Sequence, residues 1–445
     1  MTWGDTMSET AWRNTDLDAA IADVRNAYVA RNPRSLARFV EATAVMPGGN
    51  TRTVLHYDPF PIGIARAAGC RIWDADGAEY IDFLGEYTAG LYGHSNPVIR
   101  AAIDQALDGG ISFGGSNLVE QKFARAICDR FPAIERIRFT NSGTEANLMA
   151  IATACAFTRR KKVMAFKGGY HGGVFTFAGG GSPINAPYDF VLGAYNDVAS
   201  TIALIEANGP ELAAIILEPM LGSGGCIAAE PGFLRALRDA ATKFGALLIL
   251  DEVMTSRLAP GGLGASRGVT ADLTTLGKYI GGGMSFGAFG GRADIIDLFD
   301  PRRADAIPHA GTFNNNVLTM SAGLVGLTQV FTPAAQAALN ARGEALRERL
   351  NAICRAEGAK MQFTGIGSML SVHMLRGPIR TPEDAAQGDQ KLKELFFFDL
   401  LAAGIWLARR GMMALSLPIG DDECDRLAAA VREFCQSRRS LLNQP

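Results

Sequence analysis

Residues 247–291 read LLILDEVMTSRLAPGGLGASRGVTADLTTLGKYIGGGMSFGAFGG. The run Ala246–Leu250 is apolar throughout, which is typical of a strand that is buried on both faces of a sheet. It ends on the carboxylate of Asp251, and Lys278 follows a second strand-like segment, Leu273–Leu276. In open α/β sheets, ligands lie beyond the carboxyl ends of the strands. We therefore expect Asp251 and Lys278 to face the same ligand.

Few cofactors need this pair of groups, and pyridoxal phosphate is one that does. The cofactor requires a lysine amine to bind its aldehyde and a carboxylate to keep its pyridine nitrogen protonated. The alternative is that Asp251 is a solvated charge at a strand end and Lys278 an ordinary lysine. Short motifs of this kind occur by chance, so the other motifs of the chain decide between the two interpretations.

Strand and helix patterns alternate from about residue 136 onward, which predicts a mostly parallel sheet covered on both faces. The expected strands are Ile137–Phe139, Val163–Phe166, Ala213–Leu217, Ala246–Leu250 and Leu273–Leu276, and the expected helices are Thr144–Thr158, Val198–Ala207 and Gly232–Phe244.

The two ends of the chain have a different pattern. An amphipathic helix is expected from near Asp16 to before Pro33, and after residue 331 long helical patterns enclose short strands. We therefore predict an N-terminal segment, 1–70, that packs with a smaller domain. Residues 71–331 form the large α/β domain in this prediction, and residues 332–445 form the small α+β domain.

Composition excludes several classes of function. The chain has 445 residues, 48% of them hydrophobic, and a net charge of −2, so it offers no basic field for nucleic acid or an anionic membrane. No apolar stretch is long enough for a membrane span, and the N-terminus lacks a signal-peptide pattern. The seven cysteines include no C-x-x-C pair, and the five histidines show no metal-binding spacing. We expect a cytoplasmic protein with reduced thiols and without a metal, nucleic-acid or membrane partner.

A candidate phosphate site lies where the strand near residue 139 runs directly into a helix. A helix start presents free N–H groups and a positive dipole end to an anion. Gly143 allows a close approach of the backbone, and the hydroxyls of Ser142 and Thr144 add donors. The pattern Ser142-x-x-Glu145 is also a capping box, and the same residues can serve both purposes.

Three further polar segments follow strands or precede helices. Tyr170 stands among glycines after a buried strand, where an aromatic ring can stack on a flat ligand. Glu218 is another carboxylate at a strand end, and Thr312 lies in a polar loop just before a helix. The plain alternatives are a turn with an incidental aromatic, a structural histidine at His171 and an N-capping loop.

The ordered motifs N-S-G-T-E-A, Y-H-G, E-P, D-E-V, T-L-G-K-Y-I-G-G-G and G-T-F resemble those of the class III pyridoxal-phosphate aminotransferases of fold type I. The resemblance extends from about Met46 to the C-terminal helix. It implies a large domain with a mostly parallel sheet and a smaller α+β domain. It also implies that Lys278 binds the aldehyde of pyridoxal 5'-phosphate and that Asp251 faces its pyridine nitrogen.

The same resemblance assigns the remaining contacts to the cofactor. Ser142, Gly143 and Thr144 hold the phosphate, Tyr170 stacks on the ring, and Glu218 lies near the ring. Thr312 reaches the phosphate of the neighbouring subunit, which implies a homodimer with shared active sites.

Two branches of the family are similar to different segments of this chain. D-L-T-T-L-G-K and G-A-F-G-G-R resemble glutamate-1-semialdehyde 2,1-aminomutases. E-Y-T-A-G, M-T-S-R-L-A-P, G-T-F-N-N-N and Q-F-T-G-I-G-S resemble the aminotransferases of aromatic β-amino acids. The second resemblance implies that Arg52 binds a β-carboxylate, that Arg410 binds the carboxylate of an α-keto acid, and that Tyr87 lines the substrate pocket. Arg409 stands where that branch has proline, so either Arg409 or Arg410 is expected to point inward.

The expected function is transfer of an amino group between an aromatic β-amino acid and an α-keto acid, such as 2-oxoglutarate or pyruvate, by a ping-pong mechanism. Small-molecule donor and acceptor are then the only partners besides the second subunit. Three alternatives remain: a mutase, which needs no added keto acid; a broad ω-transaminase; and a cofactor-free binding protein on the same scaffold, which would be colourless when purified.

Overall fold

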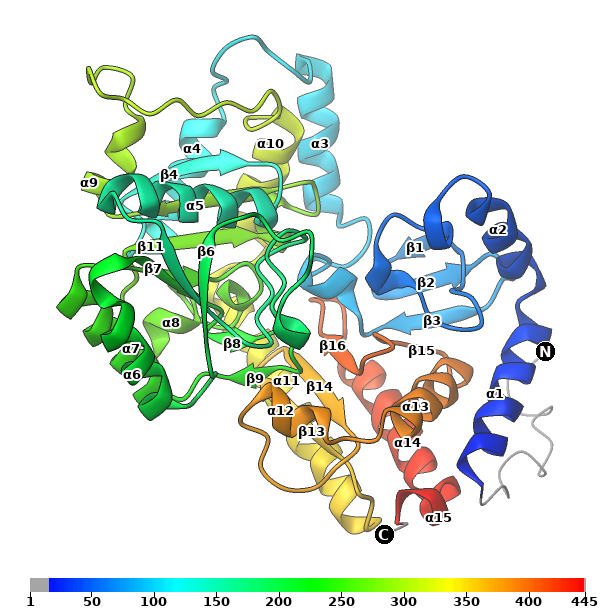
Figure 1. The fold of residues 1–445 in the computed structure, drawn as a ribbon. Coiled ribbons are helices and arrows are strands. Elements are labelled where there is room, and N and C mark those ends of the chain that lie inside the picture. The colour runs from blue at the N-terminus through cyan, green and yellow to red at the C-terminus, as the bar shows by residue number, and fades with distance from the viewer. Residues whose placement is uncertain (1–15, 444–445) are drawn as a thin grey trace.

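A sheet with helices on both faces forms the larger part of the computed structural model, which describes residues 16–443 (Figure 1). The seven strands have the order β4-β12-β11-β10-β7-β5-β6. β12 runs antiparallel to both of its neighbours, and every other pairing in this sheet is parallel. The predicted α/β class with a mostly parallel sheet is confirmed. The strands are β4 (Arg136–Thr140), β5 (Lys162–Phe166), β6 (Asp189–Gly193), β7 (Leu212–Leu217), β10 (Leu247–Asp251), β11 (Leu273–Gly277) and β12 (Gly287–Gly291).

Both faces of this sheet are buried, which explains the continuous apolar runs in its central strands. In β10, Leu248 and Leu250 pack in a cluster with residues of α6 and α7, whereas Leu247 and Ile249 pack with residues of α5 and α9 on the other face. The helices of this part are α3 (Pro97–Gly109), α4 (Glu120–Arg130), α5 (Gly143–Thr158), α6 (Val198–Asn208), α7 (Pro231–Phe244), α8 (Leu263–Ser266), α9 (Ala293–Ile296) and α10 (Val317–Val325).

Two strands of the large sheet were not expected from the sequence, β6 and β12. The sequence of β12, GAFGG, has no β-branched residue and therefore lacks the pattern of a strand. The glycines are required by close approach, because a Cβ on Gly287 would collide with the carbonyl of Ser142 and one on Gly291 with the carbonyl of Asp272. Backbone proximity, rather than side-chain packing, selects the residues of this strand.

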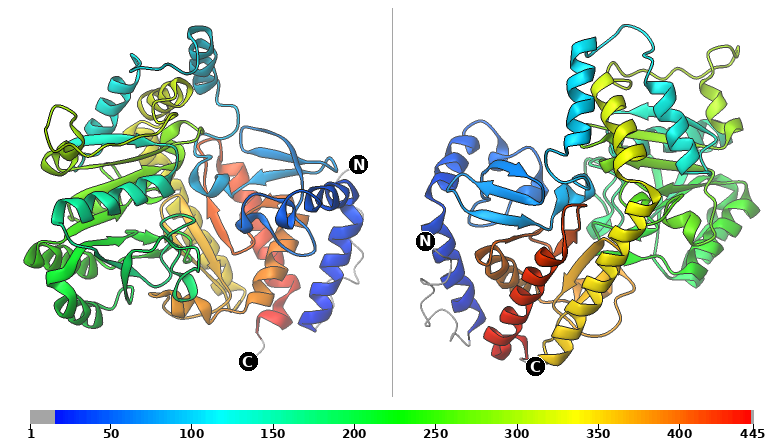
Figure 2. Two further views of the ribbon diagram at one scale, coloured as in Figure 1. Left: turned by 45° about the horizontal axis from the view of Figure 1, so that its top comes forward. Right: turned by 180° about the vertical axis from the view of Figure 1, so that it is seen from behind.

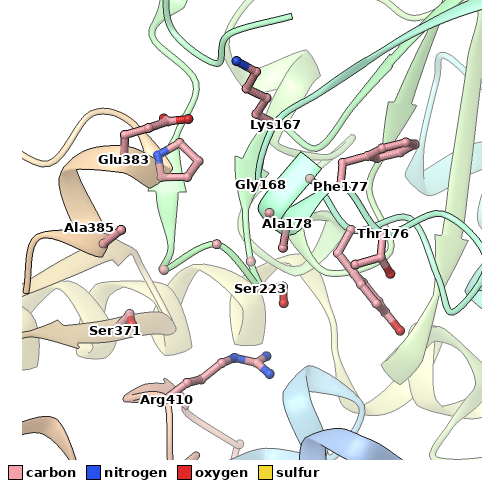
Figure 3. Close-up of a pocket in the computed structure, with 18 of the residues that line it drawn as sticks. Lys167, Gly168, Thr176, Phe177, Ala178, Ser223, Ser371, Glu383, Ala385 and Arg410 are labelled. Carbon is pink, nitrogen blue, oxygen red and sulfur yellow. The ribbon is translucent and has the colours of Figure 1, made fainter. Parts of the chain in front are cut away.

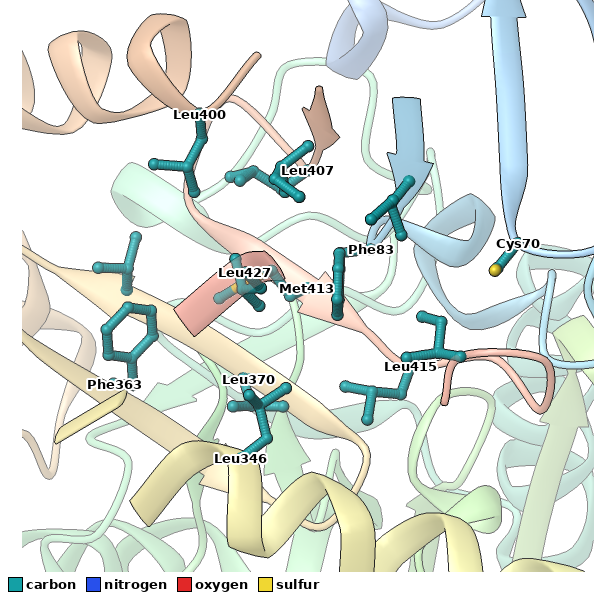
Figure 4. Packing of buried hydrophobic residues seen from close by; sticks show 14 of the residues in the cluster. Cys70, Phe83, Leu346, Phe363, Leu370, Leu400, Leu407, Met413, Leu415 and Leu427 are labelled. Carbon is teal, nitrogen blue, oxygen red and sulfur yellow. The ribbon is translucent and has the colours of Figure 1, made fainter. Parts of the chain in front are cut away.

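Two smaller sheets and the helices at both ends of the chain contribute to a large apolar core, which continues into the first part of the molecule through residues such as Phe123 and Leu276 (Figures 2 and 4). Phe363, Leu370, Met413 and Leu427 belong to this core. The strands are β1 (Ile64–Ala68), β2 (Arg71–Asp74), β3 (Glu79–Asp82) and β15 (Ile405–Trp406) in one sheet, β13 (Gln362–Ile366), β14 (Met369–His373) and β16 (Met412–Ala414) in the other, and the two-stranded ribbon β8 (Met220–Leu221) and β9 (Ile227–Ala228).

The helices of this part lie at both ends of the chain. α1 packs against α13, with the ring of Tyr28 at 5.2 Å from that of Phe398. Among residues 16–443, no single helix has both the length and the apolarity of a membrane span, and only a pair bent by 74°, Val317–Val330 with Pro333–Ala356, passes on those two measures. The helices are α1 (Leu17–Arg31), α2 (Pro33–Thr43), α11 (Pro333–Ala356), α12 (Pro382–Ala386), α13 (Gln390–Ala402), α14 (Asp421–Ser437) and α15 (Arg439–Leu442).

The sheets do not follow the predicted boundary at residue 71. β2 and β3 lie in the segment 71–331 that was assigned to the large domain, yet they pair with β1 and β15. The link is the parallel pairing of Ile405 with Ile81, which joins the start of the chain to its last third. No local sequence pattern predicts that two strands so far apart in the chain will pair. Residues 1–15 of the predicted N-terminal segment lie outside the described residues, and the three-part division stays a prediction.

Candidate active site

The carboxyl ends of the parallel strands meet at one edge of the large sheet. A Cβ built on Gly143, just after β4, would lie 3.0 Å from Cγ1 of Val253, just after β10. One built on Gly277, at the end of β11, would lie 3.1 Å from the same atom. The residues that precede Lys278 and those that follow Asp251 are therefore in van der Waals contact with the start of α5.

Asp251 is the most firmly held side chain at this edge. It is 4% exposed, and its Oδ2 accepts a hydrogen bond of 2.8 Å from Nδ2 of Asn147 and lies 2.8 Å from Nδ1 of His171. Its Oδ1 accepts from the N–H of Val253 at 3.0 Å. Three contacts hold a buried carboxylate in one orientation, so it can serve a ligand with a fixed position.

Sequence reasoning missed both side chains that hold Asp251. Asn147 lies one turn into α5 and is 1% exposed, and its Oδ1 in turn accepts a 2.7 Å hydrogen bond from the hydroxyl of Thr275. His171 was expected to be a structural residue. In the sequence, Asn147 directly follows the phosphate motif and His171 directly follows Tyr170, which places both residues near the predicted site. Neither position indicates that the side chain contacts Asp251.

Lys278 is partly buried at the start of the turn after β11 and has a φ of 56°. Burial lowers the pKa of its amine, while the carboxylate of Glu86 acts in the opposite direction. The guanidinium groups of Arg52 and Arg410 also lower this pKa, and Asp251 raises it. A lysine with a lowered pKa more readily supplies the neutral amine that reacts with a carbonyl.

The start of α5 has the form expected of an anion site. Oγ of Ser142 accepts a hydrogen bond of 3.1 Å from the N–H of Glu145, and Oε2 of Glu145 accepts from the N–H of Asn141 at 2.7 Å. This differs from the predicted capping box, in which Glu145 would bond to the N–H of Ser142. The N–H groups of Gly143 and Thr144 have no acceptor within the helix, so they remain for a phosphate.

Tyr170 lies at the rim of the site and is 43% exposed. Its N–H donates to Oε1 of Glu218 at 3.0 Å, and the N–H of Gly222 donates to Oε2 at 2.9 Å. Burial raises the pKa of Glu218 to about 7, with a contribution from Asp251 that His171 opposes. Glu218 thus joins the loop that carries Tyr170 to the segment that carries Gly222.

The two predicted substrate arginines are both held by one turn, η3 (Gly85–Thr88). Nη1 of Arg52 forms an ion pair of 2.7 Å with Oε1 of Glu86, and both side chains are about half exposed. The guanidinium of Arg410 lies 4.9 Å from the ring centre of Tyr87. Glu86 and Tyr87 have φ values of 47° and 52°, a left-handed conformation that costs roughly 1–2 kcal/mol for each such residue.

A cavity of about 640 Å³ opens between the two parts of the molecule (Figure 3). Of the predicted site residues, Tyr170 and Arg410 line it, and Figure 3 shows the Arg410 side chain extended into it. Arg409 instead forms a 2.7 Å ion pair with Glu394, so Arg410 is the inward arginine. Tyr87 is 8% exposed and contacts Arg410. The polar residues that line the cavity also include Ser223, Ser371, His373, Glu383 and Lys393.

Thr312 is exposed in the loop between α9 and α10. This loop meets the phosphate motif, since Nδ2 of Asn141 donates to Oδ1 of Asn314 at 3.0 Å. Within one chain, however, Thr312 does not line the cavity described above. Its predicted contact with the phosphate of a second subunit stays a prediction.

These residues fit pyridoxal phosphate. The oriented carboxylate of Asp251 suits a protonated pyridine nitrogen, and the Lys278 amine, whose pKa is lowered, suits an aldehyde. Gly143, Thr144 and Ser142 offer N–H and hydroxyl donors for the phosphate, and the exposed ring of Tyr170 is free to stack on the cofactor.

Comparisons with known proteins agree with this site. The family model for aminotransferase class-III matches residues 54–433. The chain is 55% identical over 426 residues to a β-phenylalanine transaminase of Variovorax paradoxus, covering 96% of this chain and 98% of that protein, and the solved structure of a β-phenylalanine aminotransferase from this organism has a TM-score of 0.95, covering 96% and 99% of the two chains.

Two further proteins extend the comparison. A glutamate-1-semialdehyde 2,1-aminomutase of Sorangium cellulosum is 40% identical, covering 91% of this chain and 96% of that protein. A solved transaminase with pyridoxal phosphate bound is 31% identical with a TM-score of 0.85, covering 92% and 98%. Both branches whose motifs were recognised in the sequence are thus found among proteins similar to this chain.

Replacing Gly172 with alanine should weaken binding of pyridoxal phosphate about tenfold or more. Gly172 has a φ of 119°, and an added Cβ would lie 2.6 Å from Cβ and 2.7 Å from Cα of Thr144. A strained residue costs of order 1–3 kcal/mol, and about 1.4 kcal/mol is tenfold in affinity. The measurement is titration of cofactor-free protein with pyridoxal phosphate. Gly173→Ala is the matched control, because its Cβ would meet nothing within 4 Å, and equal affinities in both variants would contradict the phosphate assignment.

Proposed function

Because the chain belongs to the class III aminotransferases and uses pyridoxal phosphate, we propose that it moves an amino group between an aromatic β-amino acid and an α-keto acid by a ping-pong mechanism. The observation that carries this proposal is that Arg52 and Arg410, from different segments of the chain, are held at neighbouring residues of one turn, by Glu86 and by Tyr87. The 55% identity to a β-phenylalanine transaminase supports the choice of donor.

Two arginines can bind the carboxylates of two substrates that differ in the distance between amine and carboxylate. A β-amino acid has its carboxylate one carbon further from the amine than an α-amino acid has. Because the amine of either substrate must reach the same place beside Lys278, the two carboxylates require different binding positions. Arginine suits both, since its planar guanidinium binds a carboxylate through two hydrogen bonds. We assign Arg52 to the β-carboxylate and Arg410 to the α-keto acid.

The residues around the site have distinct roles in this proposal. Bound pyridoxal phosphate supplies an electron sink for the electron pair that the substrate carbon keeps when it loses its proton. The amine of Lys278 takes that proton and delivers it, acting as base and then as acid. Asp251, held by Asn147 and His171, keeps a proton on the pyridine nitrogen. Tyr170 covers the ring.

We also propose a homodimer in which Thr312 of one subunit completes the phosphate site of the other. Ile111, Phe113, Leu118 and Phe313 are all exposed, Leu118 by 82%. The segment 110–118 and the loop before α10 adjoin, because the N–H of Val317 donates to the carbonyl of Ile111 at 3.4 Å. An apolar patch of this kind on a folded protein marks an interaction surface.

A double change of Leu118 and Phe313 to lysine should convert the protein to monomers. Two charges in an apolar interface are costly to bury, whereas they are harmless on a free surface. Light scattering after size exclusion should give twice the 47.3 kDa chain mass for the parent and the single mass for the variant. Val45→Lys, at a side chain 80% exposed on another part of the surface, is the control. A variant that keeps the parent's mass would exclude this interface.

Replacing Lys278 with alanine should abolish transamination and leave the fold intact. The change removes both the group that binds the aldehyde and the group that carries the proton. Turnover is measured with an amine donor and a keto acid, and folding by thermal melting. Lys243→Ala, at an exposed lysine that pairs with Glu206, should behave as the parent. Turnover by the Lys278 variant near the parent's rate would remove this residue from the mechanism.

Replacing Arg52 with alanine should impair the half-reaction with β-phenylalanine and largely spare that with glutamate, and Arg410→Ala should do the reverse. A hydrogen bond to a charged group contributes about 1.5–3 kcal/mol, roughly ten- to hundredfold in binding. Single-turnover spectra with each amine donor separate the two effects. Arg100→Ala, at an exposed arginine that pairs with Asp104, is the control and should not change the ratio between donors.

Two outcomes would contradict this assignment. Equal losses with both donors in both variants would mean that the two carboxylates share one site. Turnover of β-phenylalanine by the parent without an added keto acid would contradict a two-substrate transaminase and favour the mutase alternative.

A further inference from the structure

Lys393 is a buried cation that the function proposed above does not use. It lies on α13 and is 7% exposed. Among residues 16–443, its amine has no hydrogen-bond or ion-pair partner. The next residue, Glu394, shows the contrast, because it pairs with Arg25 at 2.5 Å and with Arg409 at 2.7 Å. Lysines are rarely buried in this way unless they are paired, so an unpaired one points to a ligand that pairs with it.

Lys393 lines the same cavity as Arg410. Lys393 lies on α13, and Arg410 lies in the turn between β15 and β16. Arg409, the neighbour of Arg410, is bound to Glu394, the neighbour of Lys393. Ser371 of β14, which pairs with Met412 of β16, lines the cavity as well. The two cations thus share the wall that the small part of the molecule contributes to the cavity.

The surroundings leave this positive charge uncompensated. Burial, reinforced by the guanidinium of Arg409, lowers the pKa of Lys393 to about 8, so most of the amine is protonated at neutral pH. His373 is 1% exposed, and burial and the charge of Lys393 lower its pKa to about 4, so the ring is neutral. In Figure 3 the one carboxylate of the lining, Glu383, lies across the cavity from Arg410. Figure 3 also shows Lys167 pointing away from the other labelled residues.

We propose that Lys393 binds the second carboxylate of a dicarboxylic α-keto acid whose first carboxylate is bound by Arg410. The acceptor class is then that of 2-oxoglutarate, which carries one carboxylate at each end of its chain. A monocarboxylic acceptor such as pyruvate reaches Arg410 and leaves Lys393 without a partner. Lys393 thereby distinguishes dicarboxylic from monocarboxylic acceptors. This inference rests on the role of Arg410 in the proposed function, but not on the identity of the amine donor.

The test replaces Lys393 with methionine in the holoenzyme. The KM for 2-oxoglutarate should rise about tenfold or more, as expected for the loss of a hydrogen bond to a charged group, and the KM for pyruvate should stay within about twofold. Methionine has a similar volume and removes an unpaired buried charge, so the variant should melt no lower than the parent. Lys391→Met is the matched control, because Lys391 lies on the same helix but is exposed and pairs with Asp18 at 2.6 Å. It should change neither KM.

A second measurement needs no amine donor. Glutarate, a dicarboxylate without the reactive keto group, should raise the melting temperature of the parent holoenzyme more than butyrate does. Lys393→Met should abolish that difference. Lys393→Gln, which keeps a polar group without the charge, should abolish it too, and it provides the readout if the methionine variant does not fold.

Two results would overturn the inference. One is a folded Lys393 variant with the parent's KM for 2-oxoglutarate and the parent's response to glutarate. The other is an equal rise in KM for 2-oxoglutarate and pyruvate. Failure of the proposed function looks different: the parent would not turn over β-phenylalanine, while glutarate would still protect the parent and not the variants.

Discussion

The buried carboxylate of Asp251 is the constraint around which the site is built. Taking an ionised carboxylate out of water costs several kcal/mol, and the cost is offset only where hydrogen bonds replace those to water. Here the contacts come from α5 through Asn147, from the loop after β5 through His171 and from the N–H of Val253. The three segments can satisfy Asp251 only if β4, β5 and β10 end at the same edge of one sheet. The sheet order therefore positions the carboxylate, and the carboxylate in turn ties the strand ends together.

The parts of this arrangement that could be predicted from sequence are those that are local. An apolar run that ends on Asp251, a strand that runs into the helix at Gly143 and a lysine followed by glycines are each visible in a few residues. The rule that ligands lie beyond the carboxyl ends of parallel strands then joins them without knowledge of the fold in detail. The recognised motif order added the identity of the cofactor.

The parts that could not be predicted depend on contacts between distant residues or on backbone proximity. β12 lacks strand-forming residues because its glycines lie against the carbonyls of Ser142 and Asp272. The contact between His171 and Asp251 joins residues 80 positions apart, and the pairing of Arg409 with Glu394 depends on how α13 meets the hairpin. The left-handed turn at Glu86 has no sequence signature, since three of its residues with positive φ, Glu86, Tyr87 and Thr88, are not glycine.

In the proposed function, that turn also defines how a carboxylate ligand meets Arg52. The ligand has to take the place of the Glu86 carboxylate, which holds the guanidinium at 2.7 Å. An ion pair whose partners are both about half exposed contributes only about 0–1 kcal/mol. The exchange of Glu86 for a substrate carboxylate thus costs little free energy. Before the ligand binds, Glu86 already orders the Arg52 side chain, so binding does not have to offset that loss of side-chain entropy. Tyr87 does the same for Arg410 through its ring, without a charge that the incoming carboxylate must displace. The left-handed turn therefore holds both arginines in position, through Glu86 and Tyr87. Backbone strain of this kind is expected to concentrate at the active site of an enzyme.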